Sequence, residues 1–235
     1  MIKHVFVGFL NKVNELDAAR WYFRYHSKEV VQYVGPWLRR YETYKSYPPP
    51  VEAKRFGAVG GFMTELWYAS VSDFVEAGAN FRTYTPPPGG WDFAMGPVTI
   101  APAIPSEYFM GRELVPLEKP IVRWYRLIKY PESVSLEDGE KWYLEIYIKE
   151  AIQQVGLVKY ISHRVLEKPP IKTPWQRVEE LWYESMDAWH RAVIDSPPHY
   201  SKPPWDRAEP FVDMVSTFIQ QKSDVDFLRD NPIIP

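Results

Sequence analysis

Apolar residues recur along this chain with two alternating periods, close to 2 in some segments and close to 3.6 in others. Residues 2–10 alternate and are rich in Val, Ile and Phe, which is typical of a strand, whereas the next apolar pattern is helical. Asp17 is a suitable N-cap for this helix, and Gly35-Pro36 ends it. The pattern predicts strand 2–10, helix 18–34, strand 37–46, strand 59–69, helix 70–79 and, after a Pro/Gly-rich loop over 83–97, strand 105–115.

The second half of the chain repeats this order of elements. It predicts strand 121–129, helix 136–155, strand 157–167, strand 177–184, helix 186–195, loop 196–208 and strand 210–220. The order strand, helix, strand, strand, helix, strand is the ferredoxin-like arrangement. The tail from Ser223 is expected to be irregular and to lie along the surface or across a partner.

The residues themselves also repeat. Two helical segments match at Trp21/Trp142, Tyr22/Tyr143, Lys28/Lys149, Glu29/Glu150, Gln32/Gln153 and Gly35/Gly156. The segment Glu65-Leu66-Trp67-Tyr68 recurs as Glu180-Leu181-Trp182-Tyr183, and the Pro-rich segment before Trp91-Asp92 recurs before Trp205-Asp206. Three matched segments in the same order indicate a two-copy tandem, because a solenoid needs at least about three copies of a shorter unit.

The repeat predicts an α+β fold of two ferredoxin-like domains, over residues 1–117 and 118–222, followed by a tail over 223–235. A ferredoxin-like sheet carries both helices on one face, and its other face is apolar and needs a cover. Two such sheets packed face to face within one chain would form an α+β barrel. The remaining sheet edges could still pair two chains into a homodimer.

Composition narrows the class of protein. The chain contains ten Trp, sixteen Tyr and twelve Phe, which suits either an aromatic core or a pocket for a flat ligand. A net charge of -2 offers no basic face for nucleic acid, and the absence of cysteine excludes disulfides and thiolate nucleophiles. No signal peptide and no apolar run of about 18 residues is present, so we expect a cytoplasmic protein that does not span a membrane.

Three short motifs resemble the EthD-like members of the dimeric α+β barrel superfamily. They are Tyr25-His26-Ser27-Lys28-Glu29 on the first helix, the Glu-Leu-Trp-Tyr-x-Ser passage in both halves, and residues 187–197 as a second helix. The superfamily includes cyclases, cofactor-free monooxygenases, lactone isomerases, decarboxylases and haem-binding branches. The resemblance therefore implies the architecture and does not select one reaction.

His26 is the leading candidate for a catalytic residue. Helical spacing places it on the apolar face with Tyr22, Val30 and Tyr33. An imidazole in a partly dry cavity can donate or accept a proton near neutral pH, while the simpler alternative is a half-exposed histidine bonded to a neighbour. EthD-like proteins often carry a His at this position, so the resemblance implies a functional role. Tyr147 replaces it in the second copy, which predicts one active site, in the first half.

Tyrosines of the first half are candidates to bind a substrate oxygen, because a buried phenol needs a hydrogen-bond partner. We expect Tyr22 and Tyr41 to assist catalysis and Tyr25, Tyr44 and Tyr68 to contact substrate, although core packing explains most such residues equally well.

Two further candidates lie on a strand and on a loop. Arg39 and Arg40 alternate along a strand, so that only one can face inward, and Arg40 is the candidate for binding a carboxylate or phenolate. The loop over 83–93 is either a plain connection or a lid with Trp91 near its tip.

Residues kept in both copies are better explained by the scaffold than by chemistry. We expect Glu65 and Glu180 to serve the scaffold, each as the acidic partner of an ion pair between the halves. The histidines show no metal-binding spacing, so no metal and no cofactor is expected. His190 as an axial haem ligand is the remaining alternative, although a lone His on an amphipathic helix is usually solvated.

These observations favour a cofactor-independent acid/base enzyme of the lyase, isomerase or cyclase type. Its substrate would be a hydrophobic aromatic or polyketide-like oxygenated molecule, as in aromatic compound catabolism, with His26 as general acid/base. The alternative from another class is a non-catalytic ligand-binding protein or an accessory to an oxidoreductase. A cofactor-free monooxygenase or a haem-binding member is a further alternative.

Overall fold

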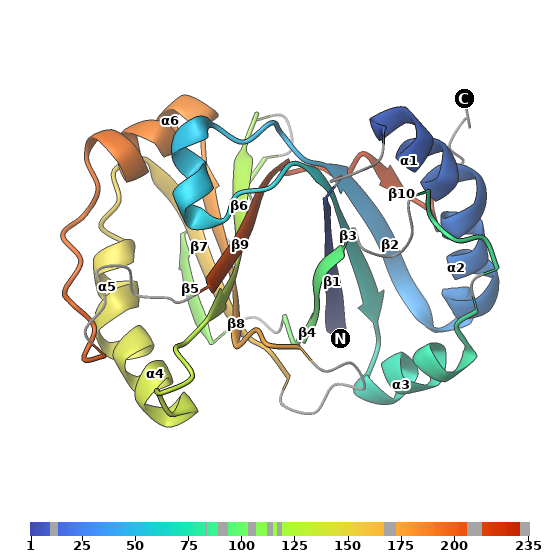
Figure 1. Cartoon of the computed structure of the whole chain (residues 1–235), viewed down its shortest axis with the longest axis horizontal. Coiled ribbons are helices and arrows are strands. Elements are labelled where there is room, and N and C mark those ends of the chain that lie inside the picture. Colours follow the sequence, from blue (N-terminus) through green and yellow to red (C-terminus); the bar gives the residue numbers. More distant parts are fainter. Residues whose placement is uncertain are drawn as a thin grey trace.

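The computed structural model describes residues 1–9, 14–82, 84–88, 94–102, 107–111, 115–116, 119–166, 173–205 and 213–230. They form two antiparallel five-stranded sheets that face each other, with helices on the outer surface of each sheet (Figure 1). The fold is therefore α+β and ferredoxin-like, and the two sheets together form the predicted barrel.

The first half follows the predicted order of elements. They are β1 (Ile2–Phe9), α1 (Glu15–Trp21), η1 (Tyr22–His26), α2 (Ser27–Val34), η2 (Gly35–Trp37), β2 (Leu38–Lys45), η3 (Val51–Phe56), β3 (Gly61–Tyr68), α3 (Val71–Asn80) and β4 (Ala94–Ile100). The first helix begins earlier than predicted, because Asn14 and not Asp17 is its N-cap, accepting from the backbone N–H of Leu16.

The second half repeats this order after one additional strand, β5. The elements are β5 (Tyr108–Gly111), β6 (Val122–Lys129), α4 (Leu136–Trp142), η4 (Tyr143–Tyr147), α5 (Ile148–Ala151), β7 (Leu157–Arg164), β8 (Arg177–Tyr183), α6 (Met186–His190), η5 (Arg191–Asp195), β9 (Asp213–Gln220) and β10 (Val225–Asp226). The strand orders are β10-β2-β3-β1-β4 in one sheet and β5-β7-β8-β6-β9 in the other.

Each half donates its last strand to the edge of the other sheet. β5 pairs with β7, and β10 pairs with β2 at the equivalent edge (Figure 1). The sheet membership of these strands does not follow the predicted boundaries at residues 117 and 222. The sequence predicts an irregular tail, and among its described residues Val225–Asp226 departs from this by extending the first sheet.

The strand predicted near 105–115 is present as β5 (Tyr108–Gly111), but it joins the second sheet, and the fourth strand of the first sheet is β4. β4 starts inside the segment predicted as a loop, and its run Val98-Thr99-Ile100 pairs with β1. The loop prediction rested on the proline and glycine content of residues 83–97. β4 lies at the end of its sheet order, where a residue without an N–H is tolerated.

The long helix of each half contains a π-helical turn that the 3.6-residue pattern did not predict. In the first half the N–H of Ser27 donates to the carbonyl of Tyr22, and in the second half Ile148 donates to Tyr143 in the same way. Such turns occur frequently at functional sites. They bring side chains five positions apart onto the same face.

Buried charges link the two sheets inside the barrel. Lys3 Nζ lies 3.2 Å from Glu65 and 2.8 Å from Glu180, and Arg123 Nη2 lies 3.1 Å and 2.8 Å from the same carboxylates. All four side chains are at most 6% exposed. Tyr125 also donates to Glu180. The predicted ion pairing between the halves is confirmed, and it involves four residues that alternate in sign.

The electrostatics of this ion quartet (Lys3, Glu65, Arg123 and Glu180) explain why it tolerates burial. Burial alone would raise the pKa of Glu180, but the cations of Lys3 and Arg123 hold that pKa well below its ordinary range. Apolar side chains from both sheets surround the quartet, including Val5, Met63, Leu127 and Val178.

Contacts between the halves also close the open sides of the barrel. Val59 donates its N–H to Ser216 on β9, and Leu166 donates to Thr99 on β4. The segment η3 of the first half crosses over and packs beside α6, with Ala53 and Phe56 in the core of the second half (Figure 1).

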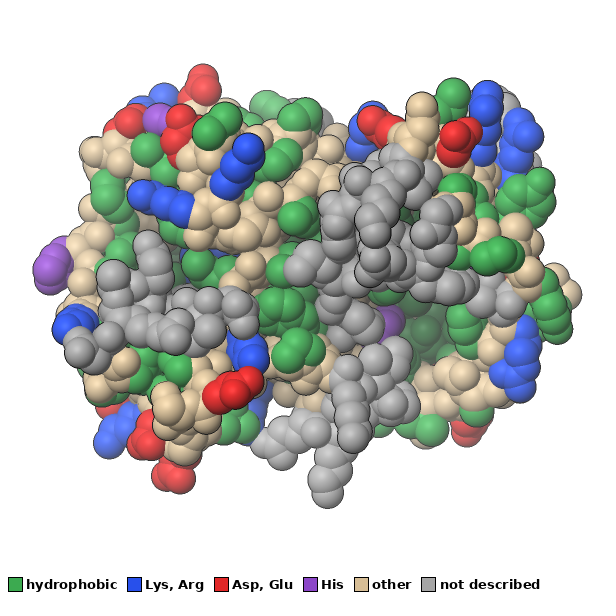
Figure 2. Space-filling model, in the orientation of Figure 1, with side chains coloured by type: hydrophobic (Ala, Val, Ile, Leu, Met, Phe, Trp, Pro, Cys, Tyr) green, Lys and Arg blue, Asp and Glu red, His purple; other side chains and the backbone are tan. Residues whose placement is uncertain are grey.

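The surface of the described residues agrees with the modest net charge. Figure 2 shows acidic and basic side chains interspersed around the periphery of this face. None of the helices formed by these residues is both long enough and apolar enough for a bilayer span.

Replacing Glu65 by Gln should lower the free energy of unfolding by about 3–5 kcal/mol, because it leaves the quartet with two cations and one carboxylate in a buried site. Denaturant unfolding would measure the loss. The matched control is Glu15→Gln, which removes the exposed Glu15–Lys45 pair and should leave the free energy of unfolding nearly unchanged, because exposed ion pairs contribute little. Equal losses for the two variants would contradict a structural role for the quartet.

Candidate active site

His26 is the last residue of the π-helical turn η1, and its imidazole is surrounded by aromatic rings. Its imidazole stacks on Trp21 with a centroid distance of 4.7 Å, and it lies 5.6 Å from the ring of Tyr22 and 6.2 Å from that of Phe81. Trp21 and His26 are five positions apart, so their stacking follows from the π-turn. Burial lowers the pKa of His26 to about 4, although the charge of Glu29 opposes this shift. The imidazole is therefore neutral at physiological pH.

Tyr22 and Tyr41 form a hydrogen-bonded pair beneath the helix. The Tyr41 hydroxyl donates to Tyr22 at 3.0 Å, and the Tyr22 hydroxyl lies 2.8 Å from Thr64 Oγ1. Burial raises the pKa of both phenols, that of Tyr41 well above its ordinary value. Both phenols therefore remain protonated and can act as hydrogen-bond donors, not as bases.

The residue after β10, Phe227, completes the wall of this site. The backbone N–H of Phe227 donates to the carbonyl of Tyr41 on β2. The centroid of the Phe227 ring lies 4.7 Å from that of Tyr41 and 5.9 Å from that of Tyr22. A cavity of about 110 Å³ lies next to Tyr22, and Phe23, Tyr44 and Phe62 also line it, whereas His26 and Tyr41 are not among its lining residues.

The start of the predicted lid is attached to the first helix. Trp21 Nε1 donates to the Thr85 carbonyl at 2.8 Å, and Glu29 accepts from the Thr85 hydroxyl and from the Tyr84 N–H. Glu150 holds Ser201 in the same way in the second half. Trp91 and residues 89–93 lie outside the described residues, so the lid remains a prediction.

Four other predicted substrate contacts lie elsewhere in the fold. Tyr25 is exposed on the outer side of the helix, and Arg40 is exposed beside the ring of Trp67. Tyr44 is buried on the inner face of the sheet, next to Arg123. Tyr68 is buried on the helix side and packs on Phe74.

The structure therefore brings together His26, Tyr22 and Tyr41. It does not bring Tyr25 or Arg40 to them. Tyr44 lines the same cavity as Tyr22, and the electrostatic influence of Tyr68 on the pKa of Tyr41 shows that these two phenols are neighbours.

His4 is a buried histidine that was not among the predicted site residues. It lies on the helix-facing side of β1, with Nδ1 3.0 Å from Thr99 Oγ1 and its ring 5.0 Å from that of Phe74. Burial lowers its pKa to about 4. The alternation of side chains along a strand predicts its position. Residues 2, 4 and 6 face the helices, whereas Lys3 and Val5 face the other sheet.

The second half has a different polar interior at the equivalent positions. Tyr143 and Tyr160 replace the Tyr22–Tyr41 pair, and their hydroxyls donate to a buried carboxylate, Glu179. Tyr147, at the position of His26, accepts from Arg126 at 2.6 Å. The tandem thus preserves the tyrosine pair and replaces the histidine, as the sequence predicted.

Neither a metal site nor a haem site is supported by the described residues. They contain no group of three or more His, Asp or Glu side chains that could hold a metal ion. His190, the alternative haem ligand, is 39% exposed, and its Nδ1 lies 3.3 Å from Asp195. It does not line either of the two cavities described in this structure.

The two facing sheets, the outer helices and the strand order define the class, an α+β barrel of the dimeric α+β barrel type. One solved structure agrees with this fold. The chain is similar to an anthrone oxidase-like protein with a TM-score of 0.50 and 9% identity, over 93% of this chain and 89% of that chain. It is also similar to chlorite dismutase from Candidatus Nitrospira defluvii in complex with imidazole, with a TM-score of 0.46 and 12% identity, over 93% and 90% of the two chains. At these identities the likeness concerns the fold alone.

One family model is similar to part of the chain. It is the chalcone isomerase N-terminal domain, which matches residues 2–85. This span covers little more than a third of the chain and contains His4, Tyr22, His26, Tyr41 and Thr64. Comparison with curated proteins gives no match.

The imidazoles of His4 and His26 should titrate with midpoints near pH 4, well below the ordinary value of 6.5. NMR of the ring protons, assigned with His4→Phe and His26→Ala, would measure this. Because the unfolded chain binds these protons at a higher pH than the folded chain, the stabilisation is complete above pH 6.5 and decreases as the pH falls from 6.5 to about 4. Midpoints near 6.5 would contradict the dry environment of both rings.

Proposed function

We propose that this chain is a cofactor-independent isomerase that acts by proton transfer on a hydrophobic aromatic molecule bearing a phenol and a conjugated carbonyl group. His26 is the general base and then the general acid. Tyr22 and Tyr41 orient the substrate oxygen. The observation that carries the proposal is a neutral, largely buried imidazole beside a protonated tyrosine pair, inside the segment similar to the chalcone isomerase N-terminal domain.

The protonation states divide the chemical roles between these residues. A neutral imidazole has a free lone pair and can accept a proton, whereas both phenols keep their protons because burial raises their pKa values. Once protonated in this dry site, the imidazolium is a strong acid, since the same burial that lowers its pKa favours return of the proton. His26 therefore suits a reaction in which a proton is removed and then returned.

An isomerisation satisfies that condition without a co-reactant. His26 Nε2 or Nδ1 removes the proton of a substrate phenol, and the phenolate oxygen forms a bond to the β-carbon of the conjugated carbonyl group. Electrons of the carbon–carbon double bond move toward the carbonyl oxygen, where a tyrosine hydroxyl donates a hydrogen bond to the developing enolate. The imidazolium then protonates the α-carbon, which restores the neutral histidine.

The surrounding aromatic residues favour a flat, apolar substrate. Aromatic rings limit the access of water to His26 and to the tyrosine pair. Trp21 and Phe81 lie beside His26, and Phe227 lies beside Tyr41. The EthD-like resemblance of the first helix supports the same assignment of His26, as do the lyase and cyclase reactions known in that superfamily. A cofactor-free oxygenation of a bound phenolate, or ligand binding without turnover, would use the same residues.

Replacing His26 by Ala should lower kcat for a 2′-hydroxychalcone between about 100- and 10,000-fold, the usual contribution of a general acid/base. Loss of the chalcone absorbance band would measure the rate, and the binding of a non-reactive dihydrochalcone would be measured in parallel. Tyr22→Phe should lower kcat by about 100-fold with a smaller change in KM, because the hydroxyl acts mainly on the developing negative charge.

His190→Ala is the matched control, because it removes an exposed imidazole from the second half, and it should leave the rate unchanged. Ligand binding without turnover by the unmodified protein would favour the non-catalytic alternative. Turnover that is unaffected by His26→Ala would overturn the proposed role of this residue.

A further inference from the structure

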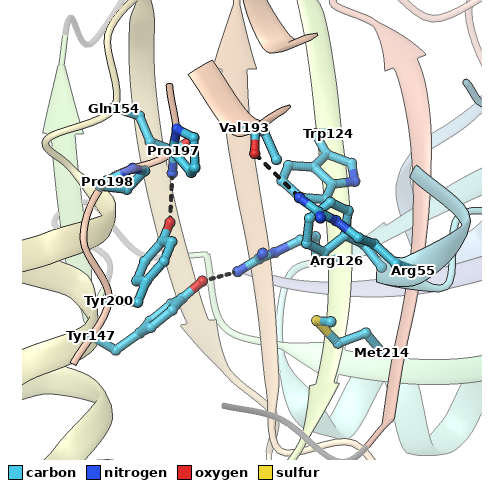
Figure 3. A pocket seen from close by; sticks show the side chains of 11 residues that line it. Arg55, Trp124, Arg126, Tyr147, Gln154, Val193, Pro197, Pro198, Tyr200 and Met214 are labelled. Carbon is cyan, nitrogen blue, oxygen red and sulfur yellow. Dashed lines mark hydrogen bonds between the residues drawn. The ribbon is translucent and has the colours of Figure 1, made fainter. Parts of the chain in front are cut away.

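A separate cavity lies in the second half of the molecule and is closed partly by the first half. It has a volume of about 130 Å³ (Figure 3). Its lining includes Trp124 and Arg126 of β6, Tyr147 of η4 and Tyr200 of the segment after α6. Arg55 and Phe56 of the crossing segment η3 complete it. Ligand sites occur preferentially at such junctions between domains.

A fixed cation lies at the polar side of this cavity. Arg126 is 4% exposed and uses Nε and Nη2 to donate to Glu179 Oε2, while Nη2 also donates to Tyr147. Glu179 accepts two further hydrogen bonds on its other oxygen, from Tyr143 and Tyr160. Nη1 of Arg126 has no acceptor among the described residues, so it remains able to donate to a ligand.

The first half shows whether the fold needs this charge pair, because it has the same strands without the pair. In the second half Arg126 is directly opposite Glu179 across β6 and β8, and at the equivalent place in the first half Phe6 is opposite Thr64. The same scaffold thus forms with an apolar and a neutral residue. A buried ion pair often contributes little net stability, because desolvation opposes the attraction. The fold does not require Arg126, and a binding role accounts for it better.

The remaining walls fit one aromatic ring. Trp124 and Met214 present apolar surface opposite the tyrosines (Figure 3), and Phe56 also lines the cavity. The ring of Tyr200 stacks on that of Tyr147 at 5.3 Å, and its hydroxyl accepts from Gln154 at 3.3 Å. The volume of about 130 Å³ is close to that of an engineered cavity of about 150 Å³ known to bind benzene, and it is small for a drug-sized ligand.

The charge balance at this cavity favours an anion. Arg126 and Arg55 supply two positive charges against the single negative charge of Glu179. Arg55 is exposed at the rim, where its guanidinium lies 4.6 Å from the ring of Phe56 and Nη2 donates to the Val193 carbonyl at 3.5 Å. One positive charge is therefore left for a ligand, and arginine is well suited to bind a carboxylate.

We propose that this cavity binds a monocyclic aromatic carboxylate of the benzoate type, with its carboxylate on Arg126 and its ring against Trp124 and Met214. The site is distinct from that of His26 and does not depend on the proposed isomerase activity. The walls of the cavity fit a hydroxybenzoate and benzoate itself, so the probe is a simple fluorinated analogue.

Titration of the full chain with 4-fluorobenzoate, followed by ¹⁹F NMR, should show saturable binding that is at least about tenfold tighter than binding of fluorobenzene. Met214→Trp fills the cavity and should weaken binding at least about tenfold.

The double variant Arg126→Phe/Glu179→Thr copies the pair found in the first half. It should therefore fold, as checked by circular dichroism, and it should lose the preference for the carboxylate.

Tyr84→Ala is the matched control for Tyr200→Ala, because Tyr84 occupies the corresponding place after the second helix of the first half. Tyr200→Ala should weaken binding and Tyr84→Ala should not. Absence of saturable binding by the unmodified chain would overturn the proposal, as would binding that Met214→Trp leaves unchanged. If the double variant does not fold, Met214→Trp and the two tyrosine variants still decide the outcome.

Discussion

The buried ion quartet between the two sheets is the constraint on which the rest of this structure depends. Removing four charges from water costs several kcal/mol for each ion, and the cost is offset only when both sheets supply their share of opposite charges in close contact. Lys3 and Glu65 come from one half, and Arg123 and Glu180 from the other. Neither inner sheet face is therefore complete alone, and the exchanged strands β5 and β10 reinforce this dependence. The two repeats form one structural unit.

Both copies keep one cation and one glutamate of the quartet at equivalent positions, whereas the residues between each sheet and its helices differ. There the tyrosine pair is kept, while the residues around it differ. The first copy has His4, Phe6, His26 and Thr64 where the second has Trp124, Arg126, Tyr147 and Glu179. A scaffold held together by its centre can change these positions without losing its fold, and it can place two kinds of chemistry at opposite ends of one molecule.

Burial acts on each side of the molecule in a different way. In the first half it favours uncharged groups: histidines lose their protons, tyrosines keep theirs, and a neutral base beside neutral donors results. In the second half the ionised groups persist, because Arg126 and Glu179 satisfy each other and the tyrosines satisfy the remaining oxygen. The first arrangement suits transient proton transfer, and the second suits binding of a lasting charge.

The sequence by itself determined the tandem ferredoxin-like fold, the scaffold role of Glu65 and Glu180, and the association of His26 with Tyr22. Each depends on short-range periodicity or on internal repetition, which are visible in one dimension. Only the tertiary structure decided that β4 begins at Ala94, that β5 and β10 exchange sheets, and that Tyr25, Arg40 and Tyr44 lie away from His26. It also revealed His4 and the Arg126 cavity. These features depend on which distant segments pair and which face of a strand becomes buried. The free energy of packing decides both of these, whereas the local sequence pattern leaves them open.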